Sequence, residues 1–262
     1  MPSGISLVRH SNRAFWRCKI PPPMTRRRWI ADEISGDRAA LVGEHATHLV
    51  RVLRVRVGQE FDIATGDSVR RGRVVSMSDD RVDFELEEEN FITDAIPLTL
   101  LLAIFKFDRM EWAIEKCTEL GVERILPVIA RRTDSHLAAA SAKRTERWRR
   151  IGKQAAEQSR RAAPPEIAAP VKLVEALGIP AALRIVLSES EDRTLLRDIV
   201  KPQAPSGGIV LAVGPEGGWT DDELQSFEQA GWVSASLGNT ILRAETAAIA
   251  ATAVAASALS SL

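Results

Sequence analysis

The pattern of apolar and polar positions divides the chain near Pro97 into two parts. In the first part, short apolar stretches alternate with charged residues and end at turn signals, which is typical of strands with one face in solvent. We expect strands at 60–64, 70–77 and 81–86, and a stretch that is partly strand at 50–57. Turns at this interval predict a small β-barrel or sheet.

After Pro97 the apolar runs become longer and alternate with helical patterns. Leu98–Phe105 is apolar almost throughout, as expected of a strand that is covered on both faces. The expected strands are 98–105, 124–130, 183–187, 209–213 and 233–237. The expected helices are 108–120, 143–161, 220–230 and 244–259, and Asp108 is the expected cap of the first. Strands that alternate with helices imply a parallel sheet, so the fold class is α/β.

Length and composition narrow the class of protein. The 262 residues suit one large or two modest domains and suffice to bury a core. Lys+Arg and Asp+Glu are equal at 35 each, which excludes a histone-like polycation and an acidic, solvating chain. Two cysteines, Cys18 and Cys117, are too few for a disulfide framework, so a reducing cytoplasm is expected. The helical spacing around Cys117 predicts that it is a core residue. No window resembles a membrane span or a secretory signal.

The first 23 residues differ from the rest of the chain. They contain no acidic residue, and Pro21–Pro23 marks a break in regular structure before Met24. We expect residues 1–23 to form a disordered extension. An organelle transit peptide, an RNA-contacting arm, and an upstream start codon with Met24 as the true start are the alternatives.

Basic residues are unevenly distributed although the net charge is zero. Arginine without lysine dominates between residues 26 and 73, and a second basic block occupies 143–161. A guanidinium binds phosphate through two hydrogen bonds and stacks on bases, so both blocks are candidate contacts with RNA. A solvated helix face would give the same charge run. The arginines that we expect to contact RNA are Arg28, Arg51, Arg54, Arg147, Arg150 and Arg160.

The segment 214–220, Gly-Pro-Glu-Gly-Gly-Trp-Thr, is the strongest local signal for a binding site. It follows an expected strand and leads into a helix, at whose start Thr220 and Glu223 form a capping box. Ligands of open α/β sheets bind at the carboxyl ends of strands, and glycines let the backbone approach a ligand closely. A tight strand-to-helix turn would explain the same residues.

A second segment, 237–247, also connects an expected strand to a helix. Arg243 and Glu245 flank the helix start, where the helix dipole favours a carboxylate, and a structural salt bridge is the alternative explanation. The chain lacks the phosphate-binding loop, the dinucleotide-binding glycine motif and the nucleophile elbow. His45 and His48 share a helix face without further ligands nearby, so no metal is expected.

Four blocks carry a resemblance that is more specific than any single loop. In chain order they are His48–Arg54, Asp108–Val122, Arg147–Glu166, and Gly214–Gly218 with Leu237–Ala247. They resemble the ribosomal RNA small-subunit methyltransferase E family over roughly residues 24–256, and the last block is similar to its C-terminal signature. The chain carries Phe107 where relatives often have glycine, and residues 1–23 have no counterpart.

The resemblance implies a methyltransferase of the α/β-knot (SPOUT) superfamily that uses S-adenosylmethionine to methylate N3 of a uridine in 16S ribosomal RNA of the small subunit. It implies a PUA-like β-barrel at 24–90, a linker at 91–97, a trefoil-knotted domain with a parallel sheet at 98–262, and a homodimer. By the same resemblance, the methyl donor contacts Leu187, Ser188, Gly214, Pro215, Glu216, Gly217, Gly218, Leu237, Gly238, Ile241, Leu242 and Arg243.

The implied reaction requires alignment of a methyl carbon with a nitrogen that loses its proton. Arg243 is expected to stabilise the charge that spreads onto the neighbouring carbonyl oxygens. Glu245 or Glu216 would act as the base or orient Arg243, and the sequence leaves these roles open. Two other functions stay in consideration: a non-catalytic RNA-binding or ribosome-assembly module, and an enzyme for another adenine-containing ligand.

Overall fold

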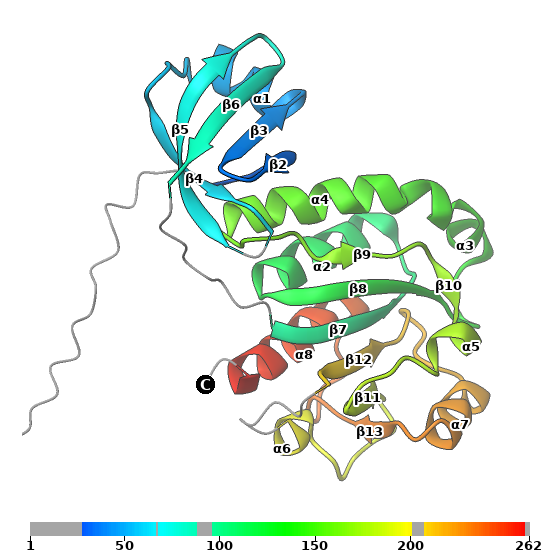
Figure 1. The fold of residues 1–262 in the computed structure, drawn as a ribbon. Coiled ribbons are helices and arrows are strands. Elements are labelled where there is room, and N and C mark those ends of the chain that lie inside the picture. Colours follow the sequence, from blue (N-terminus) through cyan, green and yellow to red (C-terminus); the bar gives the residue numbers. More distant parts are fainter. Residues whose placement is uncertain (1–27, 67, 88–95, 201–206, 260–262) are drawn as a thin grey trace, which may run out of the picture.

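The computed structural model describes residues 28–66, 68–87, 96–200 and 207–259 and arranges them around two sheets (Figure 1). The first sheet belongs to residues 28–87, here called the first domain, and the second to residues 96–259, the second domain. The expected extension, 1–23, and most of the expected linker lie outside the described residues. The domain boundaries given by the sequence therefore stay predictions.

The first domain is a mostly antiparallel sheet with the strand order β1-β4-β5-β6-β3-β2. Its strands are β1 (Arg28–Ile30), β2 (Glu33–Ser35), β3 (Arg38–Val42), β4 (Glu60–Ala64), β5 (Val69–Met77) and β6 (Arg81–Leu86). Leu41, Ile63 and Phe84 from different strands are fully buried in one cluster. The small β domain predicted for the first half of the chain is confirmed.

The second domain is built on a parallel sheet, which confirms the predicted α/β class. The strand order is β10-β8-β7-β12-β11-β13, and β9 pairs with β8. The strands are β7 (Ile96–Ala103), β8 (Val122–Ile129), β9 (Glu166–Ile167), β10 (Val171–Lys172), β11 (Leu183–Leu187), β12 (Ile209–Val213) and β13 (Val233–Ala235). Several neighbours in this sheet are distant in sequence, so the loops at its carboxyl edge come from separate segments.

Helices cover both faces of the parallel sheet (Figure 1). They are α2 (Phe107–Glu119), α3 (Ser135–Ser141), α4 (Thr145–Gln158), α5 (Leu173–Ala176), α6 (Leu196–Ile199), α7 (Asp221–Gln229) and α8 (Ala244–Leu259). Side chains of β7 alternate between the faces, because Leu100 packs in the core with α2 and α8 whereas Leu101 packs in the core with α7. In the described part of the chain, no helix is long and apolar enough to cross a membrane.

The prediction of a partial strand at 50–57 is wrong. In the structure α1 (Glu44–Thr47) continues into η1 (His48–Val52), a π-helical turn, and no strand follows before β4. Leu49 and Val55 are buried in the core of the first domain, whereas Val52 is exposed. The alternation of valine and arginine is therefore not an alternation of inward and outward faces, and tertiary packing decides the conformation.

Helix ends are the other point of difference. Asp108 does not cap α2, because α2 begins at Phe107 with Lys106 as N-cap, and Asp108 lies in the first turn. The basic helix predicted at 143–161 is shorter, and a 3-10 turn, η2 (Ala142–Arg144), precedes it. The expectations that match residue for residue are strands 60–64, 81–86, 183–187 and 209–213 and helix 244–259.

The first domain packs on α4 of the second domain through an apolar contact. Ile30, Ala64 and Val69 of the first domain form one buried cluster with Ala156 and Ala162. This cluster and the charged side chains beside it are here called the joint.

The charged part of the joint contains two ionisable side chains from each domain. Asp32 accepts hydrogen bonds from the backbone N–H of Val42, at 2.9 Å, and from Nζ of Lys153. The imidazole of His45 lies between two carboxylates, with Nδ1 3.6 Å from Asp32 and Nε2 3.5 Å from Glu157. The relative position of the two domains thus depends on charges as well as on apolar burial.

Candidate functional site

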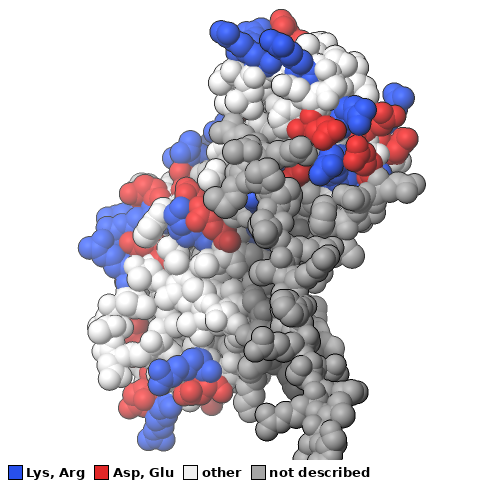
Figure 2. All heavy atoms as spheres, turned by 90° about the vertical axis from the view of Figure 1, so that its left-hand side faces the viewer, with Lys and Arg blue, Asp and Glu red and all other residues white. Residues whose placement is uncertain are grey.

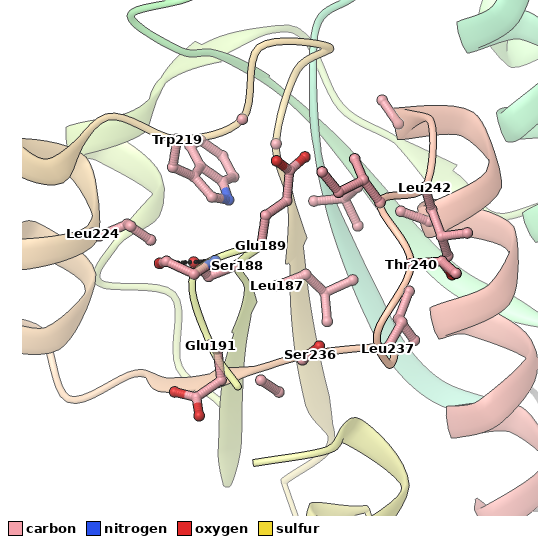
Figure 3. Close-up of a pocket in the computed structure, with 18 of the residues that line it drawn as sticks. Leu187, Ser188, Glu189, Glu191, Trp219, Leu224, Ser236, Leu237, Thr240 and Leu242 are labelled. Atoms are coloured by element: carbon pink, nitrogen blue, oxygen red, sulfur yellow. Dashed lines mark hydrogen bonds between the residues drawn. The ribbon is translucent and has the colours of Figure 1, made fainter. Parts of the chain in front are cut away.

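A cavity of about 480 Å³ lies at the carboxyl ends of three parallel strands, β11, β12 and β13 (Figure 3). Residues 188–192 after β11, 214–219 after β12 and 236–242 after β13 line it, and we call it the three-loop pocket. These strands are adjacent in the order β12-β11-β13, so their loops meet although they are distant in sequence. The two glycine-containing segments that the sequence analysis selects therefore share one cavity.

The loop after β12 is a tight turn whose course depends on glycine. A Cβ atom at Gly214 would lie 3.3 Å from Cε2 and Nε1 of the Trp219 ring. Gly218 has a φ of +69°, in the left-handed region that L side chains rarely adopt. Its N–H donates to the carbonyl of Pro215 at 2.8 Å. The glycines let the turn pack closely on Trp219, and Glu216 and Trp219 of the same turn line the cavity with their side chains.

Two contacts from the end of β8 hold this loop and the helix after it. The guanidinium of Arg132 donates hydrogen bonds to the carbonyls of Gly217 and Trp219. The backbone N–H of Arg131 donates to Oε1 of the buried Glu223 at 2.8 Å. Glu223 is also half of the capping box that begins α7, which confirms the predicted helix start.

Serine side chains hold the other two loops from within. The hydroxyls of Ser188 and Ser190 lie 2.8 Å apart, which closes the turn after β11. The N–H of Gly238 donates to Oγ of Ser236 at 3.1 Å, and that hydroxyl donates back to the carbonyl of Gly238 at 3.1 Å. Gly238 has a φ of +129°, a conformation that favours glycine at this point of the third loop.

The charged lining of the three-loop pocket is mostly acidic. Its acidic members are Glu189, Glu191, Asp192, Glu216 and Asp221. Figure 3 shows Glu189 extending into the cavity from the end of β11. Backbone N–H groups of Arg193 and Thr194 donate to Oε1 of Glu191, each at 2.9 Å, and lower the pKa of that carboxyl group. A cationic ligand would find a favourable potential here.

Trp219 lines the same cavity. Its indole Nε1 is buried and has no hydrogen-bond partner among the described residues. Figure 3 shows the ring nitrogen turned toward the cavity. The nitrogen is covered by the fold, with Gly214 packed beside it, so Trp219 contributes its ring to the wall of the cavity.

Most of the residues expected to bind the donor line the cavity. They are Leu187, Ser188, Gly214, Pro215, Glu216, Gly217, Gly218, Leu237, Gly238, Ile241 and Leu242. Arg243 is not part of this lining and is exposed immediately before α8. The acidic residues Glu189, Glu191 and Asp192 are not among the predicted site residues, and their signal in the sequence is their position after the expected strand 183–187. The binding roles themselves stay predictions.

The two candidate catalytic carboxylates meet at Arg109, a residue of α2. Nη1 of Arg109 is 3.3 Å from Oε1 of Glu216, and its Nε is 3.8 Å from Oε1 of Glu245. Glu216 is exposed in the glycine loop, whereas Glu245 is buried at the start of α8. Among the described residues Arg243 forms no ion pair, so the alternative of a salt bridge between Arg243 and Glu245 is not what the structure shows.

Basic side chains lie on both domains, beside acidic ones (Figure 2). Arg51 and Arg54 follow α1 and are exposed, and Arg51 also lies 3.4 Å from Asp79. Arg54 has a φ of +51°, so its backbone lies in the left-handed region. On α4, Arg150 is exposed. These three guanidinium groups are accessible to a polyanion.

The other three arginines expected to contact RNA are less free. Arg147 forms a two-pronged pair with Glu111, with N–O distances of 2.6 and 2.8 Å, which raises the pKa of Arg147. Burial lowers the pKa of Arg28, the nearby carboxylate of Asp62 opposes this shift, and the nearby charge of Arg160 adds to it. Arg28 of the first domain and Arg160 of the second thus lie close together at the joint.

Phe107 has a structural place in the fold. Its ring packs edge-to-face on Trp148, with centroids 6.0 Å apart, and the guanidinium of Arg144 lies 4.7 Å from its centroid. These contacts join the start of α2 to α4. Phe107, where the resemblance leads us to expect glycine, is therefore accommodated by packing between two helices.

Comparisons with protein families and with known proteins agree with this geometry. Residues 93–256 match the model of an RNA methyltransferase domain, and residues 43–87 match the model of an RNA methyltransferase PUA domain. The first match covers the three-loop pocket, and the second covers most of the first domain.

Relatives in other organisms carry one name. The chain is 35% identical over 206 residues to the ribosomal RNA small subunit methyltransferase E of Synechocystis, an alignment that covers 76% of this chain and 66% of that protein. It is 34% identical to the protein of the same name from Mycobacterium bovis, over 82% of this chain and 84% of that one. The enzyme of this name from Neisseria gonorrhoeae has a crystal structure with bound S-adenosylmethionine. It superposes on this chain with a TM-score of 0.75 at 33% identity, and the superposition covers 87% of this chain and 95% of that one.

Proposed function

This chain belongs to the ribosomal RNA small subunit methyltransferase E family, and we propose that it transfers a methyl group from S-adenosylmethionine to N3 of a uridine in 16S ribosomal RNA. The observation that carries this proposal is the meeting of three sequence-distant loops at the carboxyl ends of β11, β12 and β13. The same edge of an α/β sheet is where ligands of such folds bind.

The residues of the three-loop pocket fit the proposed methyl donor. S-adenosylmethionine carries a sulfonium and an ammonium group, which suit the acidic residues Glu189 and Glu191. Gly214 and Gly218 add no side chains to the cavity wall. In this proposal the predicted binding residues at 187–188, 214–218 and 237–242 hold the donor.

When bound, the donor supplies an activated methyl group, so this chain has to align the acceptor nitrogen and remove its proton. Glu216 is the better placed base, because it lines the cavity and is exposed to an incoming nucleotide. Glu245 is buried at the start of α8 and does not line the cavity, so an incoming nucleotide would reach it less readily. Arg243, exposed beside the cavity, would donate hydrogen bonds to a uridine carbonyl oxygen as negative charge develops there.

The basic side chains of the first domain and of α4 would bind the RNA backbone. Arg51, Arg54 and Arg150 are accessible, and Arg28 and Arg160 at the joint would add two further positive charges. Arg147 would have to exchange its carboxylate partner for phosphate. Because RNA recognition favours unstacked bases, the target uridine would be turned out of its stack to reach the pocket.

Assembly and location complete the proposal. We expect a homodimer in the cytoplasm, by analogy with the family. The alanine-rich α8 buries Ala248, Ala251 and Ala255 within its own domain, so a dimer contact would use a different face of that helix. Light scattering of the purified chain measures the oligomeric state.

Two measurements test the function. Titration calorimetry with S-adenosylmethionine should show saturable heat, and small subunits that lack the modification should accept one methyl group. The methylated nucleotide, mapped in cells with and without the gene, identifies the uridine and the ring position. Absence of heat would favour a non-catalytic RNA-binding module or an enzyme for another ligand.

A further inference from the structure

Arg109 lies at the meeting point of three segments that are distant in sequence. It belongs to the first turn of α2 and faces Glu216 of the glycine loop and Glu245 of α8. Its helix is firmly seated, since Met110 and Cys117 of α2 are fully buried and α2 packs against α8. The guanidinium is therefore presented to both carboxylates from a rigid support.

The glycine loop is held at two points. At one end Arg132 donates to the carbonyls of Gly217 and Trp219. At the other end the pair formed by Glu216 and Arg109, 3.3 Å apart, connects the loop to α2. Within the loop the N–H of Gly218 also holds the carbonyl of Pro215, so the pair with Arg109 is the contact that connects Glu216 itself to the rest of the domain.

Arg109 also lies beside the carboxylate of Glu245. The side chain of Glu245 is 6% exposed, and its Oε2 has no hydrogen-bond partner among the described residues. A buried carboxylate requires a compensating positive charge, and Arg109 supplies it at 3.8 Å. A planar guanidinium can face two carboxylates at once, which the single ammonium of a lysine does less well.

From this geometry we propose that Arg109 is a positioning residue for methyl transfer. It holds the glycine loop in the shape that binds the donor, through Glu216, and ties this loop to the start of α8, through Glu245. The proposal rests on the proposed function, because the ligand whose loop is held is S-adenosylmethionine. A loop that is ordered for only a fraction of the time lowers the apparent affinity by that fraction.

The first test is the replacement Arg109→Gln, with donor affinity measured by calorimetry. We expect the Kd for S-adenosylmethionine to rise about tenfold, and Arg109→Lys to recover part of the loss. The KM for the RNA should stay unchanged while kcat falls. Arg124→Gln is the matched control, because Arg124 is similarly exposed, lies 3.3 Å from Glu166 and is remote from the cavity; its Kd should equal that of the wild type.

The second test is a double-mutant cycle on donor affinity. Glu216→Gln removes the exposed partner and leaves Glu245 paired, so it avoids an uncompensated buried charge. If Arg109 acts through Glu216, Glu216→Gln raises the Kd in the wild type and has little further effect in the Arg109→Gln background.

The outcomes separate this proposal from the proposed function. If the wild type gives no heat with S-adenosylmethionine, both are wrong. If the wild type binds but Arg109→Gln only lowers the unfolding temperature, or if the two effects on Kd multiply, Arg109 is not a positioning residue and the function stands. If instead only the RNA affinity and its salt dependence change, Arg109 contacts phosphate, and the proposal is overturned.

Discussion

The three-loop pocket and the joint both bring distant segments together, but they do so with different chemistry. The pocket is lined by three loops, and in the loop after β12 Gly214 packs against Trp219 and Gly217 against Arg132. The joint consists of an apolar cluster with Asp32, His45 and Lys153 beside it. A loop packed closely around glycine is sensitive to added volume, whereas a contact made from ionised side chains is sensitive to lost charge and to pH.

The largest expected effect comes from adding volume to the pocket. In Gly217→Leu the new Cβ would lie 3.3 Å from Cδ of Arg132, and the rest of the side chain would displace that arginine or enter the cavity. We expect the affinity for S-adenosylmethionine to fall at least about 100-fold, or roughly 3 kcal/mol. Gly178→Leu is the control, since nothing lies within 4 Å of a Cβ at Gly178. Retained donor binding in Gly217→Leu, measured by calorimetry, would remove this loop from the donor site.

A smaller effect is expected where the first domain would bind RNA. In Arg51→Gln/Arg54→Gln, two accessible charges are lost far from the pocket. The affinity for a 16S RNA fragment should fall about tenfold, and the slope of log K against log salt should decrease by roughly 1.5. The donor Kd should not change, because neither residue lines the cavity. Arg197→Gln on α6, also exposed, serves as control. An unaltered salt slope would show that this end of the first domain does not bind RNA.

The joint should respond to loss of one charge by about 1 kcal/mol of unfolding free energy, because solvent screens part of the interaction. Asp32→Asn leaves Lys153 and His45 without their shared carboxylate. Burial opposes ionisation of Asp32, but hydrogen bonds from His45, Lys153 and Val42 outweigh it and hold its pKa well below the usual range. The exposed Asp37→Asn should have no effect.

The direction of that pKa shift fixes the pH dependence. A carboxyl group with a lowered pKa stabilises the fold fully above its ordinary pKa of about 3.9, and this contribution is lost as the pH falls toward the lower, folded value. Denaturant titrations between pH 7 and pH 3 should therefore show a steeper acid loss in the wild type than in Asp32→Asn. Parallel curves would mean that the carboxylate of Asp32 does not hold the joint.

The comparison also explains what the sequence predicts and what it leaves open. The bounds of Ile209–Val213 and Ala244–Leu259 could be predicted from the sequence. The strand is buried on both faces and the helix on one, and this burial produces the apolar pattern directly. The glycine segment is recognisable because a turn, a capped helix and a strand end coincide there. In contrast, β9 and β10 are too short for a period to appear.

Charge pairs between distant segments leave no pattern in the sequence. Nothing in the chain predicts that Arg109, rather than Arg243, faces Glu216 and Glu245, because the pairing depends on how α2 packs against α8. The ion pairs of the joint cannot be predicted from the sequence either, since Asp32 and Lys153 are far apart in the chain and each lies in an ordinary polar stretch. Sequence therefore predicts the pocket better than the contacts that hold it in place.

The smallest expected effect concerns Cys117, whose helical spacing predicts a core residue rather than a nucleophile. The structure places it at 0% exposure under α8, where Oγ1 of Thr252 donates to its sulfur at 3.4 Å. Burial raises the pKa of the thiol to about 12, so at pH 8 only roughly one molecule in ten thousand carries the reactive thiolate. In a Cys18→Ser background, the folded protein should resist iodoacetamide for hours and react promptly in urea. Prompt alkylation without denaturant would show that α2 and α8 separate readily, and the rigid support assumed for Arg109 would be lost with it.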